Sequence, residues 1–174
     1  RLNAGAMPMR PEINAAQDLL GAALRRVGGA IDPKRSRDTA GRAAANGDAN
    51  PVLLGQFDFV QSLRALVNLL ENADKYSPPD EPIELTVRRV GDRLQFAVAD
   101  RGPGVEEAEA VGIFGPFYRA PGVAPDARGA GLGLAIALLL IASQGTGEVT
   151  CATEPVEDGS RQQFGVAQGV THAE

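Results

Sequence analysis

Hydrophobic positions along the chain follow two spacings, one typical of helices and one typical of strands. Between residues 13 and 27 apolar residues recur every three or four positions, which predicts a helix that Gly28-Gly29 ends. A second helical pattern runs from about residue 53 to residue 76, which a break near Phe57 could divide. Ser77-Pro78-Pro79 ends this helix, because a residue before proline disfavours the helical conformation.

Alternating apolar and polar residues predict strands, and these occur at residues 83–90, 93–99, 148–153 and 161–168. Gly91-Asp92 is a tight turn between the first two, and Glu157-Asp158-Gly159-Ser160 is a polar turn between the last two. A short helix is predicted around residues 106–111, and a longer, apolar helix from residue 133 to residue 143. Helices on one face of a mixed, mostly antiparallel sheet make a two-layer α/β sandwich of the α+β class.

Two stretches lack either spacing. Residues 32–50 are rich in Arg, Ala, Gly, Asp and Asn, and we expect a disordered loop or a weak edge strand there. Residues 120–130 contain repeated Pro and Gly, which favours a flexible loop.

Composition narrows the class of protein. The 174 residues, of which 44% are hydrophobic, suit one domain with a sizeable core. A net charge of −5 argues against nucleic-acid binding, no apolar run approaches the roughly 18 residues of a membrane span, and no secretory signal is apparent. The single Cys151 cannot form an internal disulfide and is expected to be a small buried residue, which fits a reducing cytoplasmic setting.

The clearest candidate for chemistry is one face of the predicted helix that ends at Tyr76. At about 100° per residue, Asn68, Asn72 and Lys75 fall within roughly 60° of one another, opposite an apolar face. Asparagine oxygen can ligate Mg²⁺, and lysine meets phosphate as a point charge. Taken alone, the segment is more typical of an ordinary amphipathic helix with a solvated face.

Two glycine-rich segments follow this helix. Asp100-Arg101-Gly102-Pro103-Gly104 comes directly after a predicted strand, so its carboxylate could accept a hydrogen bond from an exocyclic amine while the glycines admit a flat ring. An ordinary Asp/Gly/Pro turn is the alternative.

The second segment is Gly129-Ala130-Gly131-Leu132-Gly133-Leu134-Ala135, which leads into an apolar helix. Unpaired N–H groups and the positive end of a helix dipole favour a phosphate there. It does not match a dinucleotide-binding loop, because Leu134 stands where that spacing requires glycine and no strand immediately precedes Gly129.

In this order and spacing, the three segments resemble the ATP-binding domain of bacterial sensor histidine kinases, in the superfamily that includes gyrase, Hsp90 and MutL. Residues 68–76 are similar to the family's N box, residues 100–104 to its first glycine box and residues 129–135 to its second. Residues 113–119, Ile-Phe-Gly-Pro-Phe-Tyr-Arg, resemble the F box that opens a mobile lid, here about residues 115–130. The resemblance covers roughly residues 53–170, and the wording of the N box is closest to potassium-sensing Kdp-type kinases.

The resemblance implies a role for each matched residue. Asn72 would ligate Mg²⁺, with Asn68 as a supporting contact, and Asp100 would read the adenine amine of ATP. Phosphates would be met by Lys75 and Tyr76 and by the loop formed by Gly129, Gly131 and Gly133, with N–H groups around Leu132 and Leu134. Gly102 and Gly104 would let the purine approach the backbone. Arg119 and Arg128 bracket the lid, where each could touch the γ-phosphate or remain a solvated charge.

Asn68 also bears on the type of reaction. ATP-hydrolysing relatives carry a glutamate four residues before the magnesium-binding asparagine, and Asn68 cannot act as such a base. We therefore expect an ATP-binding kinase module that transfers the γ-phosphoryl group to a histidine on another domain. A self-sufficient ATPase and a non-catalytic nucleotide- or partner-binding module of the same fold are the alternatives.

The resemblance further implies a layout and partners. The only histidine, His172, lies in the predicted tail of residues 171–174 and is not expected to accept phosphate. Residues 1–12 would be the remnant of a linker to a dimerisation hairpin that carries the acceptor histidine, and residues 13–170 the catalytic domain. This isolated domain should bind ATP without phosphorylating itself. The hairpin and a downstream response regulator would be its partners, with no nucleic-acid or membrane contact, and the parent protein could be anchored in the inner membrane.

Overall fold

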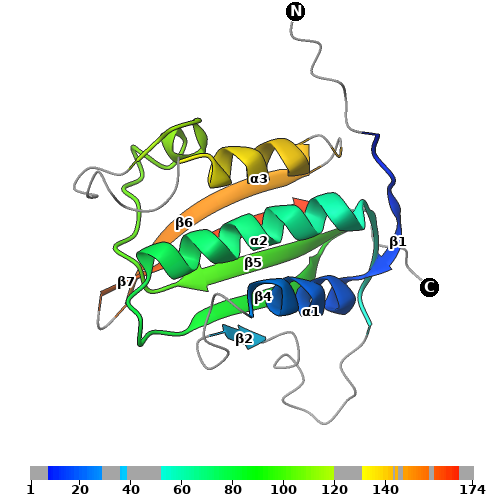
Figure 1. Cartoon of the computed structure of the whole chain (residues 1–174), viewed down its shortest axis with the longest axis horizontal. Helices are drawn as coiled ribbons and strands as arrows, with labels where there is room; N and C mark the ends of the chain where they lie inside the picture. Colours follow the sequence, from blue (N-terminus) through cyan, green and yellow to red (C-terminus); the bar gives the residue numbers. More distant parts are fainter. Residues whose placement is uncertain are drawn as a thin grey trace, which may run out of the picture.

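The computed structural model describes residues 8–28, 36–38, 52–119, 131–142, 144, 147–156 and 159–168. Within these ranges three α-helices cover one face of a five-stranded sheet (Figure 1). The helices are α1 (Ala16–Val27), α2 (Phe59–Tyr76) and α3 (Gly133–Ala142). The predicted two-layer α+β sandwich is therefore confirmed.

The sheet has the strand order β2-β4-β5-β7-β6. Its strands are β2 (Ser36–Asp38), β4 (Ile83–Val90), β5 (Arg93–Asp100), β6 (Glu148–Val156) and β7 (Gly159–Gln168). β2 pairs with β4 in parallel, and the other neighbours pair antiparallel. The sheet is thus mixed and mostly antiparallel, as the alternating pattern and the tight turn after Val90 predict.

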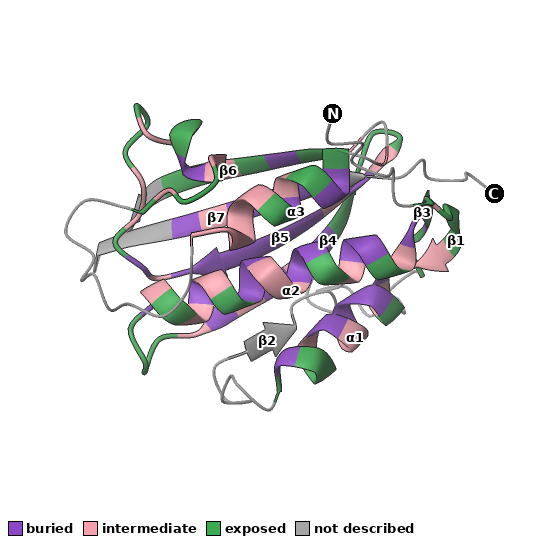
Figure 2. Cartoon of the chain, turned by 45° about the horizontal axis from the view of Figure 1, so that its top comes forward, coloured by how far each residue is buried: buried purple, intermediate pink, exposed green. Residues whose placement is uncertain are grey.

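One hydrophobic core lies between the helices and the sheet (Figure 2). Leu20 of α1 and Leu66 of α2 are fully buried, as are Phe96 of β5 and Leu85 of β4. Phe57 meets Phe96 edge to face, with 6.0 Å between the ring centroids. The apolar spacing of the sequence thus marks the side chains that hold the two layers together.

The predicted starts of the first two helices are wrong, because both segments begin as strands. β1 (Glu12–Ala15) and β3 (Leu54–Phe57) form a separate antiparallel two-stranded sheet. The inner face of β3 lies on β5, so closely that a methyl group added at Gly55 would be 2.5 Å from Cδ1 of Leu94. The pairing of two distant segments overrides the local helical pattern.

Smaller differences concern loops and strand ends. Residues 107–111 form turns rather than the short helix, and a 3₁₀ helix, η1 (Gly112–Phe114), follows them. β2 is the edge strand considered for residues 32–50, and the remainder of that stretch is outside the described residues. β6 and β7 extend to Val156 and begin at Gly159, so half of the predicted polar turn is strand. Most of the predicted lid lies outside the described residues.

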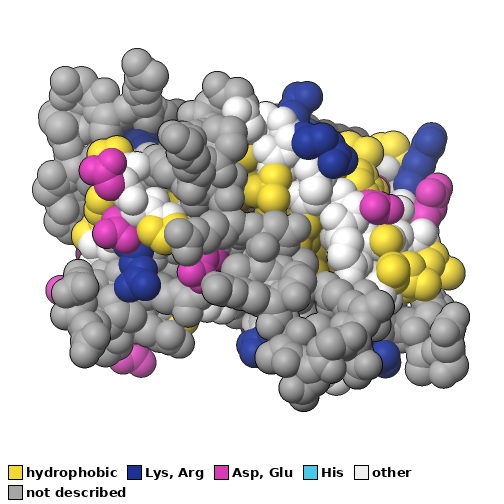
Figure 3. Space-filling model, turned by 90° about the horizontal axis from the view of Figure 1, so that it is seen from below, with side chains coloured by type: hydrophobic (Ala, Val, Ile, Leu, Met, Phe, Trp, Pro, Cys, Tyr) yellow, Lys and Arg dark blue, Asp and Glu magenta, His cyan; other side chains and the backbone are white. Residues whose placement is uncertain are grey.

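Two further features concern the length of the helices and the charges on the surface. No helix within the described ranges has the length and apolarity needed to cross a membrane. Seen from below, the described residues expose basic, acidic and apolar side chains (Figure 3).

Candidate functional site

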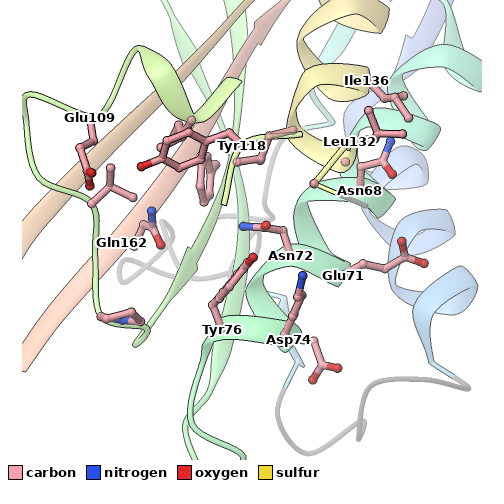
Figure 4. A pocket seen from close by; sticks show the side chains of 18 of the residues that line it. Asn68, Glu71, Asn72, Asp74, Tyr76, Glu109, Tyr118, Leu132, Ile136 and Gln162 are labelled. Atoms are coloured by element: carbon pink, nitrogen blue, oxygen red, sulfur yellow. The ribbon is translucent and has the colours of Figure 1, made fainter. Parts of the chain in front are cut away.

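A cavity of about 750 Å³ opens between α2, residues 103–118, the start of α3 and the strand β7 (Figure 4). It brings together segments far apart in the sequence. The predicted site residues that line it are Asn68, Asn72, Lys75, Tyr76, Gly104, Gly131, Leu132, Gly133 and Leu134. The N box and parts of both glycine boxes therefore meet at one cavity.

α2 forms the polar wall of the cavity, and its sequence determines which side of the helix is turned toward the cavity. Its N-terminus is capped by Asp58, whose Oδ1 accepts a hydrogen bond from the Gln61 N–H at 3.0 Å, and its last turn carries the ammonium of Lys75. Asn72 and Tyr76 point into the cavity, whereas Glu71 points away from Asn72 (Figure 4). Since Leu66 and Leu70 are buried against the core, the polar face can only turn toward the cavity.

The wall presents one cation close to an aromatic ring. Nζ of Lys75 lies 4.9 Å from the centroid of the Tyr76 ring, a cation–π contact that leaves the ammonium at the edge of the cavity. The wall thus offers carboxamides, a phenol and a positive charge, which can bind a polyphosphate, together with the carboxylates of Glu71 and Asp74, which also line the cavity.

Asp100 ends β5 and is 2% exposed. Its Oδ1 accepts a hydrogen bond from the Gly102 N–H at 2.7 Å, and its Oδ2 is buried with no hydrogen-bond partner. Burial raises the pKa of this carboxyl to about 6, and the Gly102 N–H opposes the shift. Because buried polar atoms are usually hydrogen-bonded, the unpaired Oδ2 of Asp100 is available to accept a hydrogen bond from a ligand.

Gly102 is required by its surroundings. A methyl group added there would lie 2.8 Å from Oδ1 of Asp100 and 3.1 Å from the carbonyl oxygen of Tyr76. Asp100 and Gly102 are adjacent to the cavity but are not among its lining residues, whereas Gly104 is.

Gln162 is a site residue that the sequence reasoning missed. It lies on β7 directly opposite Asp100, is 4% exposed and lines the cavity. Its Nε2 donates a hydrogen bond to Sγ of Cys151 at 3.6 Å. The sequence offered little signal, since glutamine in a weak strand pattern is usually a surface residue.

Cys151 lies behind Gln162, partly buried as expected. Burial raises the pKa of its thiol, the Gln162 amide lowers it, and the charge of Asp100 raises it further. The thiol therefore stays protonated and is a packing neighbour of the site.

The loop that precedes α3 is held against the F box. The Phe117 N–H donates to the carbonyl oxygen of Gly131 at 3.1 Å. Gly131 has a φ of +70°, and a methyl group there would lie 2.7 Å from the carbonyl oxygen of Tyr118. Glycine is therefore needed for both conformation and space.

At the other side this loop approaches the polar wall. A methyl group added at Gly133 would lie 4.0 Å from Oδ1 of Asn68. The start of α3 and the polar face of α2 thus enclose one end of the cavity.

Apart from the carboxylate of Glu109, the remaining lining is largely apolar and aromatic. It includes Ile113 of η1, Phe164 of β7 and Tyr118. Phe114 meets Phe164 edge to face at 6.4 Å between centroids, so the F box is anchored on the sheet. Burial and the charge of Glu109 raise the pKa of Tyr118, so its phenol stays protonated.

Other predicted residues lie elsewhere. Arg119 is exposed and does not line the cavity, and Arg128 and Gly129 fall outside the described residues. Within the described ranges no group of three or more His, Cys, Asp and Glu side chains could hold a metal ion. The predicted metal residue Asn72 would therefore need other ligands from a bound phosphate.

The fold and the cavity are those of a nucleotide-binding α+β sandwich. Residues 58–168 match the family model described as histidine kinase-, DNA gyrase B-, and HSP90-like ATPase. This match covers more than half of the chain, and the protein belongs to that family. The predicted resemblance is confirmed, and the closer likeness to Kdp-type kinases stays a prediction.

Among curated proteins, the chain is similar to sensor proteins. It is 38% identical over 109 residues to the alginate biosynthesis sensor protein KinB of Pseudomonas aeruginosa, which is 63% of this chain and 17% of KinB. It is 42% identical over 97 residues to the swarming motility regulation sensor protein RssA of Serratia marcescens, which is 52% of this chain and 20% of RssA. The chain thus spans about a fifth or less of the length of these relatives.

Solved structures have the same fold. The mycobacterial sensor histidine kinase MprB matches with a TM-score of 0.73 at 20% identity, over 95% of this chain and 100% of that chain. Full-length ShkA in complex with AMPPNP matches with a TM-score of 0.74 at 26% identity, over 99% of this chain and 34% of that chain. These likenesses confirm the architecture of the described residues.

Proposed function

We propose that this chain is the ATP-binding kinase module of a two-component sensor histidine kinase. The observation that carries the proposal is the convergence on one cavity of Asn72, Lys75 and Tyr76 from α2 with the glycine loop at the start of α3. The relatives are named as sensor proteins, and one of the similar structures was solved with an ATP analogue.

The buried end of the site suits adenine. The unpaired Oδ2 of Asp100 would accept a hydrogen bond from the exocyclic amine, and Gly102 and Gly104 would admit the ring. Ile113 and Phe164 supply apolar surface for a flat base. A guanine would place a carbonyl oxygen against the carboxylate, which leaves two acceptors facing each other.

The open end suits the triphosphate. Lys75 and Tyr76 would contact phosphate oxygens, and the N–H groups around Leu132 and Leu134 would donate at the start of α3. The Asn72 oxygen would be the protein ligand of Mg²⁺, which takes its remaining ligands from phosphate and water and neutralises charge in the transfer.

Phosphoryl transfer to a protein group fits this site better than hydrolysis. Asn68 has no basicity, and the nearby carboxylate of Glu71 points away from Asn72 (Figure 4). The acceptor would be a histidine on a dimerisation hairpin, with a response regulator downstream. The domain would work in the cytoplasm, with its parent protein anchored in the inner membrane.

Titration calorimetry with a non-hydrolysable ATP analogue tests the proposal, with and without Mg²⁺ and with the GTP analogue as control. We expect the ATP analogue to bind with micromolar to sub-millimolar affinity and the GTP analogue not to bind. Asn72→Ala should remove the dependence of affinity on Mg²⁺, because it deletes the proposed ligand. No binding to the folded chain, or binding of both nucleotides equally, would contradict the assignment.

A second assay addresses the reaction. Radiolabelled ATP should transfer phosphate to a histidine-containing hairpin supplied in trans and should release little free phosphate without it. Rapid phosphate release by the chain alone would instead support the ATPase alternative.

A further inference from the structure

α3 is not amphipathic, because it has no polar face. Its residues, GLAIALLLIA, include no side chain that can donate or accept a hydrogen bond. Ala137, Leu140 and Ile141 are buried, yet Leu139 is 69% exposed and Ile136 is 38% exposed. Since apolar contacts are non-directional, they leave the rotation and axial position of such a helix weakly defined.

Polar contacts are found instead at the two ends of α3. At the N-terminal end, the Gly131 carbonyl is bound to Phe117. Past the C-terminal end, Oε1 of Gln144 accepts from the Asp58 N–H at 3.0 Å, and its Nε2 donates to Oγ of Ser62 at 3.1 Å. Asp58 is 5% exposed and Ser62 is fully buried.

The same cluster holds the N-terminal segment of the described chain. Oδ2 of Asp58 accepts from the Arg10 N–H at 2.8 Å, while its Oδ1 caps α2. The Asp58 carboxylate thus joins the segment before β1 to α2, and the Asp58 backbone N–H joins α2 to the residue Gln144 beyond the end of α3. In Figure 1 these ends of α2 and α3 both face β1, and the cavity lies at their opposite ends.

We propose that Arg10, Asp58, Gln144 and Ser62 form a polar clasp that positions the phosphate loop. The position of the segment at Arg10 is passed through Asp58 and Gln144 to α3, which moves as a rigid rod and carries Gly131–Leu134 at its far end. The clasp therefore makes nucleotide affinity responsive to the N-terminal segment. This inference rests on the proposed function for its ligand, but the coupling itself concerns the unliganded protein.

Hydrogen–deuterium exchange of the unliganded 174-residue chain tests the coupling at the amides of residues 136–140. Arg10→Pro removes the donor N–H together with the side chain and fixes φ, and Arg10→Ala, which loses the side chain but keeps the N–H, is the matched control. The hydrogen bond from Arg10 to Asp58 is partly buried, and losing one such bond changes an opening equilibrium about fivefold. We expect roughly fivefold faster exchange for Arg10→Pro and no change for Arg10→Ala. Equal exchange in the two variants would overturn the proposal.

A second pair of variants separates positioning from general destabilisation. Gln144→Met keeps the length of the side chain and removes its hydrogen bonds, whereas Val27→Ala trims α1 on the far side of α2. At matched loss of melting temperature, we expect at least fivefold faster exchange of residues 136–140 for Gln144→Met alone. An equal increase in the exchange rate of these amides in both variants would mean that Gln144 only contributes to general stability, and would overturn the inference.

Nucleotide binding provides the readout that links the clasp to the site. Arg10→Pro and Gln144→Met should each weaken the ATP analogue about fivefold or more, and the double variant should lose less than the product of the two. Fully multiplicative losses would mean that the two residues act separately. Should the wild-type chain bind no nucleotide, the proposed function fails while the exchange comparison still decides the coupling.

Discussion

The two helices that enclose the cavity, α2 and α3, specify their orientation in different ways. α2 has a capped N-terminus, a buried apolar side and a polar side that supplies Asn72 and Tyr76. α3 is apolar around its circumference, and its polar contacts are made beyond its ends. The site therefore combines two kinds of element. The orientation of the polar face of α2 follows from its own sequence, whereas the position of the loop before α3 depends on the rest of the fold.

Core truncation should produce the largest contrast between the helices. Leu66 of α2 is fully buried, so Leu66→Ala should cost about 2–5 kcal/mol of unfolding free energy. Leu139 of α3 is 69% exposed, and Leu139→Ala should change it by less than about 0.5 kcal/mol. Urea denaturation of both variants checks this, and similar losses would mean that α3 is packed on all sides.

The loop before α3 should be intolerant of a single methyl group. Gly131→Ala meets both a positive φ and the carbonyl oxygen of Tyr118, and strain of this kind costs about 1–3 kcal/mol. Gly112→Ala is the matched control, because nothing lies within 4 Å of the added carbon. Calorimetry should show at least tenfold weaker ATP binding for the first variant alone, and an equal effect in both would remove the loop from the site.

Stability should fall as pH rises through the titration of Asp100. Its pKa is about 6 in the folded chain against an ordinary value of 3.8, so the folded state holds the proton more tightly. The resulting stability is fully present below pH 3.8 and is lost as pH rises to about 6, on the order of 2–3 kcal/mol. Asp100→Asn should remove this slope in urea titrations between pH 4 and 7, and an unchanged slope would assign it to another group.

Asp100→Asn should also weaken adenine recognition, by roughly 1–3 kcal/mol, because an amide in the wrong orientation leaves a buried amine unpaired. Parallel titration with ATP and GTP analogues measures the effect. Unchanged discrimination between the two bases would leave Asp100 as a turn residue.

How far the sequence predicts each part depends on whether the signal is local. The polar face of α2 and the pairing of β4 with β5 follow from residue spacing, because neighbouring positions determine them. The strands β1 and β3 could not be predicted, since each is defined by its pairing with a segment far away along the chain. Gln162 was missed for the same reason, as its importance comes from the Asp100 that lies opposite on another strand.

The pairing of β1 with β3 also has a consequence for the order of folding. Asn14 reaches the carbonyl of Phe57 across 43 residues, whereas β4 and β5 are joined by a two-residue turn. Closing the longer loop costs more chain entropy, so the hairpin can form early and the two-stranded sheet closes late. Contacts that close last are commonly among the first to open in the native state. We therefore expect β1 to detach briefly from β3 while the core stays folded, at a lower free-energy cost than global unfolding.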